Sequence, residues 1–182
     1  FLLHVGSFDK RKDLITLVKA FKLLKEDRKN KHLKLVLAGQ KILNGNLDVL
    51  NELESYIFTN NLSKSILMTG YLSGAEICSL YKKALIYVFP SIEEGFGIPV
   101  LEAFAMKTPV VSSNAAAMVE IAKGAAQHYN KGDHTELFKT LNKLIISKPK
   151  RIHLIEKGSE RLKAFSREKF IKDYEQFILN SV

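Results

Sequence analysis

Two glutamates bracket a glycine-bearing stretch whose residue types suit an anionic ligand that carries hydroxyl groups. Seven residues separate Glu94 from Glu102, and Gly95-Phe96-Gly97 follows Glu94 directly. Glycines let the backbone approach a ligand closely, and Pro99 suits the first turn of a helix. The loop would therefore present free backbone N–H groups and a positive helix end to an anion. We expect Glu102 in the first helical turn, facing a crevice.

The two carboxylates could take separate partners. Glu102 could accept paired hydrogen bonds from vicinal hydroxyls, such as those of a ribose. Glu94 could bind sugar hydroxyls or face developing positive charge. The simpler interpretation makes Glu94 a solvated loop acid and Glu102 a charge that complements the helix dipole.

A second candidate lies in the polar loop 9–13, after the first apolar run. Gly6-Ser7 ends that run, and Arg11-Lys12 follows shortly after. A guanidinium offers a planar fork and an ammonium offers a point charge, and both bind phosphate oxygens. The alternative is a solvated basic loop. Neither a Walker sequence nor the dinucleotide fingerprint G-x-G-x-x-G is present.

Alternating apolar runs and helical patterns must position these residues. The apolar runs are 1–5, 33–38, 66–69, 85–89, 110–112 and 125–129, and helical patterns cover 14–29, 47–59, a segment opened by a Ser73/Glu76 capping box, 118–123 and a segment opened by Asp133 and Glu136. This alternation predicts an α/β fold with a doubly wound, mostly parallel, six-stranded Rossmann-like sheet. In such a sheet, ligands bind beyond the carboxyl ends of the strands. We expect one domain over 1–182, with 150–182 forming C-terminal helices that meet near Ser166.

Composition sets broad limits. The chain has 182 residues, of which 46% are hydrophobic and 26% charged, with a net charge of +9 and one cysteine. These values are ordinary for a globular protein, and the positive charge suggests anionic partners, although most lysines read as solvated helix faces. Cys78 alone excludes an internal disulfide, and we expect it to be buried on a helix. The chain starts inside an apparent core strand, which suggests a fragment of a longer protein.

The stretch from Phe89 to Ala103 closely resembles the E-x7-E signature of retaining glycosyltransferases with the GT-B fold, of the group 1 or family 4 type. The resemblance spans nearly the whole chain in the right order, and it continues through 5–14, 35–39, 70–73, 108–114 and Glu120. It implies the C-terminal, nucleotide-sugar-binding half of a two-domain enzyme whose N-terminal acceptor half is absent.

The resemblance also implies roles for individual residues. Glu94 would hydrogen-bond the donor sugar as the catalytic residue, Glu102 would bind the ribose, and Leu72 would pack on the base. The diphosphate and sugar would be held by Lys12 and Arg11, by Gly6 and Ser7, and by the backbone at Gly95, Phe96, Gly97 and Ile98. Transfer would proceed with retention and without a metal. The absence of Asp-x-Asp and of a His/Cys cluster agrees with that expectation.

Four positions depart from the family pattern. Ser7 stands where arginine is common, so one phosphate cation is missing unless Arg11 replaces it. Lys107 replaces a usual glycine, Gly74 replaces a common acid, and Met118 lies where Leu-Pro-Glu is more usual. Gly74 weakens any assignment of the base.

The sequence therefore predicts a hexosyltransferase-type enzyme domain that needs no cofactor. It would bind a UDP- or GDP-type sugar and serve a glycan or glycolipid acceptor in polysaccharide or lipopolysaccharide biosynthesis. We expect a cytoplasmic location, with peripheral contact at the inner membrane face, no nucleic-acid partner and weak turnover by this domain alone. Two alternatives remain: a GT-B sugar-nucleotide epimerase, and a non-catalytic nucleotide- or nucleic-acid-binding module.

Overall fold

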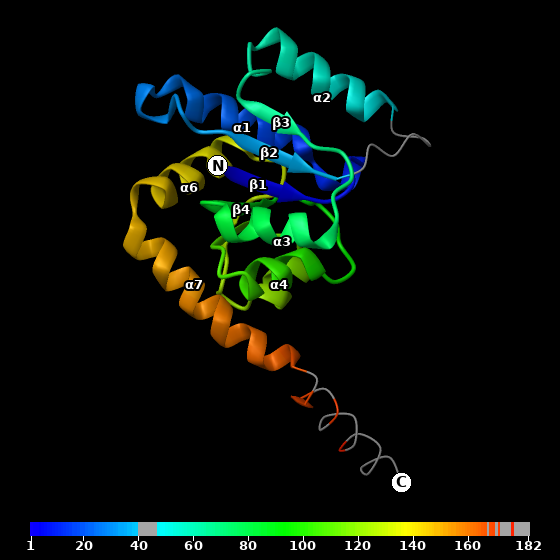
Figure 1. Cartoon of the computed structure of the whole chain (residues 1–182), viewed down its shortest axis with the longest axis vertical. Helices are drawn as coiled ribbons and strands as arrows, with labels where there is room; N and C mark the ends of the chain where they lie inside the picture. The colour runs from blue at the N-terminus through cyan, green and yellow to red at the C-terminus, as the bar shows by residue number, and fades with distance from the viewer. Residues whose placement is uncertain (40–46, 167, 170, 172–175, 177–182) are drawn as a thin grey trace.

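The computed structural model describes residues 1–39, 47–166, 168, 169, 171 and 176. Six strands form one sheet in the order β3-β2-β1-β4-β5-β6, and every strand pairing in this part of the chain is parallel (Figure 1). The strands are β1 (Leu2–Val5), β2 (Leu35–Ala38), β3 (Ile66–Met68), β4 (Ile86–Phe89), β5 (Val110–Ser113) and β6 (Gln127–Tyr129). This topology confirms the predicted doubly wound α/β fold.

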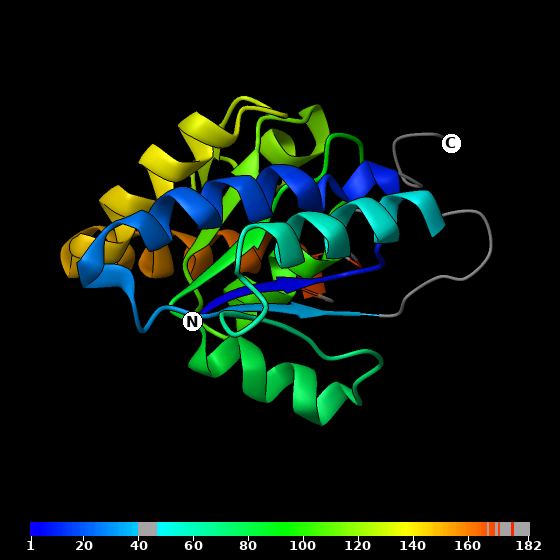
Figure 2. The same ribbon diagram turned by 90° about the horizontal axis from the view of Figure 1, so that it is seen from above.

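Helices cover both faces of the sheet. They are α1 (Leu14–Glu26), α2 (Leu47–Thr59), α3 (Gly74–Lys83), α4 (Ile98–Ala105), α5 (Ala116–Ala122), α6 (His134–Ile146) and α7 (Lys148–Leu162), with the 3-10 turns η1 (Lys10–Lys12), η2 (Arg28–Asn30) and η3 (Lys163–Phe165). The apolar residues of α1, α2 and α6 pack in one core, and those of α3, α4 and α5 pack in another. Figure 2 shows α1 and α2 on one side of the strands and α3 on the other.

Strand residues contribute alternately to the two cores, because successive side chains point to opposite faces of the sheet. Leu2, Leu35 and Ile86 lie in register on three neighbouring strands and belong to the α1 side. Leu3 and Val36 pair in the next register position and belong to the α3 side. All five are buried, which explains why the strands read as continuous apolar runs and not as alternating patterns.

Strand order reverses direction at β1. The chain moves from β1 outward to β2 and β3, then returns to place β4 on the other side of β1. The loops after β1 and β4 therefore lead to helices on opposite faces of the sheet. At such a switch point a ligand crevice is expected beyond the carboxyl ends of the strands, and we refer to this place as the crevice.

Local signals predicted several elements correctly. Helix α2 has the expected bounds, Ser73 and Glu76 form the predicted capping box, and the Asp133 carboxylate accepts the N–H groups of Thr135 and Glu136. The predicted first helix ends earlier, at Glu26, because the Asp27 carboxylate accepts Lys29 N–H and starts the separate turn η2.

Two predictions were wrong, and two others concern residues outside the part of the chain that the structure describes. The loop predicted at 9–13 contains the 3-10 turn η1, which Asp9 caps by accepting Arg11 N–H. Cys78 is exposed, because α3 packs on the sheet mainly through Tyr81 on another part of its surface. The loop 40–45 and most of the helix predicted after Ser166 fall outside the described residues. Among those that are described, no helix is long and apolar enough to cross a bilayer.

Candidate active site

The crevice between β1 and β4 joins the two loops that the sequence singled out. The backbone N–H of Ile92, in the loop after β4, donates to the carbonyl of Arg11 at 2.8 Å. This single backbone hydrogen bond connects η1 to the glycine-bearing loop. The predicted phosphate loop and the predicted sugar loop therefore lie side by side.

Lys12 and Glu94 meet inside that site. The Lys12 Nζ lies 2.5 Å from Glu94 Oε1, and the two side chains are only 9% and 12% exposed. The same ammonium lies 4.8 Å from the ring centroid of Phe89, at the end of β4. A nearly buried cation here is held by a carboxylate and by an aromatic face. The residue expected to bind phosphate and the residue expected to bind sugar thus neutralise each other.

Arg11 and Ser7 have a different partner. The Asp9 carboxylate accepts hydrogen bonds from the Ser7 hydroxyl at 2.6 Å and from the Arg11 guanidinium at 3.3 Å. Burial opposes the ionisation of Asp9, but the hydrogen bond from Ser7 and the charge of Arg11 outweigh it and lower the pKa of Asp9. Arg11 remains 54% exposed at the edge of the crevice. Two of the predicted donor-binding side chains are therefore engaged by an acid that sequence reasoning did not single out.

Gly97 sets the start of α4. It has a φ of 103° and forms the N-cap, and Pro99 occupies the first turn as predicted. A Cβ on Gly97 would lie 2.5 Å from the Met118 Cε, so α5 leaves no room for a side chain there. Phe96 and Ile98, on either side, are 50% and 61% exposed. The loop thus offers backbone and apolar surface at the crevice mouth.

Glu102 lies in the second turn of α4 and not in the first, because the helix already begins at Ile98. Its side chain is exposed and accepts a hydrogen bond from the Tyr81 hydroxyl at 3.2 Å. Burial, followed by the charge of Glu102, raises the pKa of Tyr81. Burial also raises the pKa of Tyr87, to which Glu102 and Glu94 both contribute. The charges of both glutamates therefore act on Tyr87, and Glu102 also contacts Tyr81.

His4 forms the floor of the crevice. It is fully buried on β1, and its Nδ1 lies 3.2 Å from the Val88 carbonyl oxygen of β4. Burial lowers its pKa to about 4, so the imidazole is neutral near pH 7. A Cβ added to Gly6 would lie 3.1 Å from His4 Nε2. The only sequence signal for this residue is a polar side chain within the apolar run 1–5.

The end of α7 supports the glycine-bearing loop. Phe165, in η3, packs edge to face on Phe96 at a centroid distance of 6.1 Å. Arg161 stacks on Phe165 at 4.6 Å and donates to the carbonyls of Ile121 and Glu120 at 2.8 and 3.0 Å. These contacts tie the loop to the end of α5.

Comparison with known proteins decides the family. Residues 1–161 match the family described as Glycosyl transferases group 1. The chain belongs to this family. The serotype-specific mannosyltransferase WbdA of Escherichia coli is 29% identical over 147 residues, which cover 80% of the chain and 17% of WbdA.

Solved structures have the same fold. The C-terminal domain of the group 1 family protein LpcC from Francisella tularensis superposes with a TM-score of 0.78 at 25% identity, covering 90% of this chain and 84% of that one. Anabaena HepE, solved in complex with UDP, gives a TM-score of 0.86 at 20% identity and covers all of this chain and 48% of its own. The chain thus spans about half of HepE and a smaller part of WbdA.

Leu72 of this group 1 chain lies in a separate hollow. It is half-buried and lines a pocket of about 420 Å³ beside α3, together with Thr69, Ala75, Glu76, Ser79 and Leu80. The pocket is mainly aliphatic with a polar margin. Its chemistry suits the face of a planar base.

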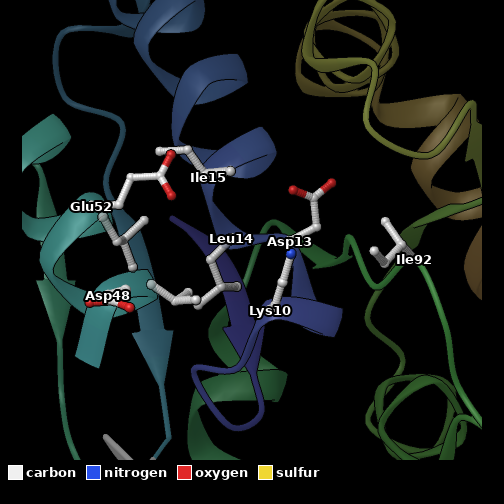
Figure 3. Close-up of a pocket in the computed structure, with 9 residues that line it drawn as sticks. Lys10, Asp13, Leu14, Ile15, Asp48, Glu52 and Ile92 are labelled. Atoms are coloured by element: carbon white, nitrogen blue, oxygen red, sulfur yellow. The ribbon is translucent and has the colours of Figure 1, made fainter. Parts of the chain in front are cut away.

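A larger cavity of about 500 Å³ adjoins the crevice on the α1–α2 side (Figure 3). Figure 3 shows Asp48 and Glu52 on α2, facing a wall made by the start of α1, with Ile92 on the loop after β4. The full lining is Lys10, Asp13, Leu14, Ile15, Asp48, Val49, Glu52, Leu53 and Ile92. None of these is a predicted donor residue of the group 1 site. Over the described part of the chain, no cluster of three His, Cys, Asp or Glu side chains could hold a metal ion.

Proposed function

We propose that the crevice binds a nucleoside-diphosphate sugar and that the chain is the donor-binding half of a retaining, metal-independent glycosyltransferase. The observation that carries this proposal is the meeting of Lys12 and Glu94 at the switch point between β1 and β4. A cation can stabilise the leaving diphosphate, and a carboxylate can face the positive charge that develops at the anomeric carbon. The two groups therefore serve the two sides of the bond that breaks between sugar and diphosphate.

The leaving diphosphate would be stabilised by Lys12 and by the start of α4. The Lys12 ammonium is preorganised in a nearly dry position, where its interaction with a phosphate oxygen is stronger than in water. Backbone N–H groups at Gly97 and Ile98 open α4 and add the positive end of its dipole. Arg11, exposed at the rim, would supply a second cation.

Glu94 would exchange its partner when donor binds. Its carboxylate, released as Lys12 turns to the diphosphate, would accept sugar hydroxyls and face the positive charge that develops at the anomeric carbon. Glu102, hydrogen-bonded to Tyr81, would bind the ribose diol, and Leu72 would contact the base. Glu94 and Glu102 would not be the acid and base of a hydrolase, since the leaving group is a diphosphate and no water is activated.

WbdA is a mannosyltransferase, which makes a mannosyl donor the first to test for this chain. HepE was solved with UDP, so UDP is the first rival nucleotide. We propose hexosyl transfer to a glycan or lipid-linked acceptor in surface polysaccharide synthesis. The acceptor would be bound by an N-terminal domain, as the small share of WbdA and HepE that the chain spans suggests.

Calorimetric titration tests the site. The chain is titrated with GDP, UDP and ADP in the presence of a chelator and then of Mg²⁺. The variants are Lys12→Ala, Glu102→Ala and the exposed neighbour Lys10→Ala as control. Loss of a charge-assisted hydrogen bond of about 1.5–3 kcal/mol should weaken the preferred nucleotide about 10- to 100-fold in the first two variants. Lys10→Ala should bind as the unmodified chain does.

Failure of all three nucleotides to bind, or equal affinity in every variant, would show that the site is assigned wrongly. A strong requirement for Mg²⁺ would contradict metal independence, but it would leave the assignment of the binding residues unchanged. Interconversion of a sugar nucleotide by the chain would favour the epimerase alternative, in which the same fold performs other chemistry.

A further inference from the structure

The corner between α6 and α7, residues 143–153, is basic and apolar at once. Ile146, the last residue of α6, is 75% exposed, and Ile152 in α7 is 45% exposed. Exposed lysines lie near them in the sequence: Lys143, Lys148 and Lys150. No aspartate or glutamate occurs between 143 and 153. Exposed aliphatic side chains together with lysines on one corner are typical of an interaction surface and not of a merely solvated helix face.

Helix electrostatics do not explain these lysines. Lys148 and Lys150 lie in the first turn of α7, which contains no acidic residue. Cations at a helix N-terminus are unfavourable, because they face the positive end of the dipole. Lys82 and Lys83 contrast with them, since they lie in the last turn of α3, where the dipole favours cations. An unfavourable local placement points to a role beyond folding.

Arg151 is the member of the corner that has a structural role. Its guanidinium donates to the carbonyls of Leu144 and Ile145 at 2.5 and 2.8 Å and so caps the end of α6. The described contacts include no ion pair or hydrogen bond of the Lys148 or Lys150 ammonium. These two ammonium groups are therefore available to an external anion.

The corner lies at the end of the molecule opposite the crevice. Helix α6 starts near the carboxyl ends of the strands and runs back, so its last residue is at the amino ends. Figure 2 shows the gold and orange corner at the same end as the N-terminus and as the turn that follows α1. That turn carries the exposed cations Arg28, Lys29 and Lys31 beside the exposed acids Glu26 and Asp27, so the charges at this end of the molecule are mostly positive.

We propose that the α6–α7 corner binds an anionic lipid surface. Ile146 and Ile152 insert at the boundary between headgroups and acyl chains, and Lys143, Lys148 and Lys150 contact lipid phosphates. A nucleic acid is the weaker occupant, because the corner has no Phe, Tyr or Trp on which a base could stack. Docking by this end leaves the donor crevice facing away from the bilayer. The proposal is independent of which ligand the crevice takes.

Vesicle flotation tests it, using the whole chain with vesicles of phosphatidylcholine alone and with about one third phosphatidylglycerol. Three variants are compared: Lys148→Ala/Lys150→Ala, Ile146→Ser/Ile152→Ser, and the matched control Lys82→Ala/Lys83→Ala. Each lysine near an anionic surface contributes about a fivefold gain in affinity, so the first variant should bind anionic vesicles about 25-fold more weakly. The isoleucine variant should also lose binding, and the control should bind as the unmodified chain does. Binding should fall as salt is raised.

Several results would overturn the proposal. Equal binding to neutral and anionic vesicles, or none to either, would do so. Equal losses in the corner variant and in the Lys82/Lys83 control would show that only net charge matters. Tight binding to a single-stranded oligonucleotide, with none to vesicles, would assign the surface to nucleic acid. Unchanged melting temperatures and nucleotide affinities in all variants show that the fold is intact.

Discussion

Lys12 and Glu94 neutralise each other at the centre of the crevice, and this pairing decides what a ligand must do there. In the proposed function, a diphosphate would compete with Glu94 for the ammonium, while sugar hydroxyls would compete with Lys12 for the carboxylate. A complete sugar nucleotide would satisfy both groups after they part. A nucleotide without sugar leaves Glu94 nearly buried without a partner, which is unfavourable.

This competition predicts opposite effects for the two residues. Glu94→Gln should bind the nucleoside diphosphate more tightly, by about fivefold or about 1 kcal/mol, because Lys12 is no longer held by a carboxylate. The same variant should gain nothing for the sugar nucleotide, which loses a charged acceptor. Calorimetry with both ligands measures the difference. Weaker binding of the nucleotide alone would show that Glu94 does not compete for Lys12.

His4 predicts a loss of stability in acid. Its pKa is lowered from 6.5 to about 4 in the folded chain. As the pH falls from 6.5 toward 4, the unfolded chain therefore binds a proton that the folded chain excludes, and stability decreases by up to about 3 kcal/mol. His4→Gln, which cannot be protonated, should flatten that part of the curve. Urea unfolding from pH 7 to pH 4 measures it, and identical slopes in both proteins would contradict the assignment.

Some residue-level features were predictable and others were not. Pro99 and the Ser73/Glu76 pair are encoded within one helical turn, so their positions follow from local sequence. The Lys12–Glu94 contact joins residues 82 apart, and no spacing rule reports it. Asp9 was overlooked because its role depends on the fold of η1, which brings Ser7 and Arg11 to one carboxylate.

At the scale of elements, the start of α4 is held from two sides. The Met118 side chain of α5 fills the space beside Gly97, and Phe165 of η3 covers Phe96. Farther along, Gly158 lets α7 lie close to Phe104, since a Cβ there would be 2.7 Å from the ring. The helix whose N-terminus faces the crevice is thus fixed by two glycine contacts and one aromatic pair.

Two neighbouring glycines should respond differently to alanine. Gly97→Ala forces a side chain into a positive φ and against Met118, which should destabilise the chain by about 1–3 kcal/mol. Gly95→Ala meets nothing within 4 Å and should change stability by less than about 0.5 kcal/mol. Thermal unfolding of both variants measures the contrast. Equal destabilisation of the two variants would contradict this explanation, because the positive φ and the Met118 contact occur only at Gly97.

Element existence was more predictable than element bounds. The parallel sheet follows from the continuous apolar runs of the strands, and the helices on both faces follow from apolar residues at helical spacing between those runs. Glu102 was placed one turn too early because the expected helix start at Pro99 ignored Ile98, which Gly97 caps through its positive φ. Cys78 was expected to be buried because a small apolar residue on a helix suggests packing, but the sheet-facing surface of α3 is set by Tyr81.

At the scale of the whole molecule, the candidate donor residues Lys12 and Glu94 lie at the carboxyl edge of the sheet of one domain. The cavity of about 500 Å³ beside them, between α1 and α2, is lined by none of the candidate donor residues (Figure 3). An open edge can bind a ligand on one side only. A second body must cover the other side before water is excluded from the reacting bond.

The chain alone should therefore bind donor but transfer sugar poorly. With GDP-mannose and a glycan acceptor, we expect nucleotide release close to the uncatalysed background, while nucleotide affinity stays measurable. Supplying the N-terminal half of a relative in one polypeptide with this chain should restore turnover. A coupled assay for released nucleotide measures both cases, and full turnover by the chain alone would show that it carries a complete active site.

The pairing of β1 with β4 also constrains how the chain folds. The His4–Val88 contact spans 84 residues, so its formation closes a chain segment that contains β2, β3 and their helices. Contacts with such long sequence separation slow folding, and we expect this one to form late. A nucleotide that recognises the closed crevice would then slow unfolding and leave the folding rate unchanged. Binding of a nucleotide would in this sense indicate that the chain has folded completely.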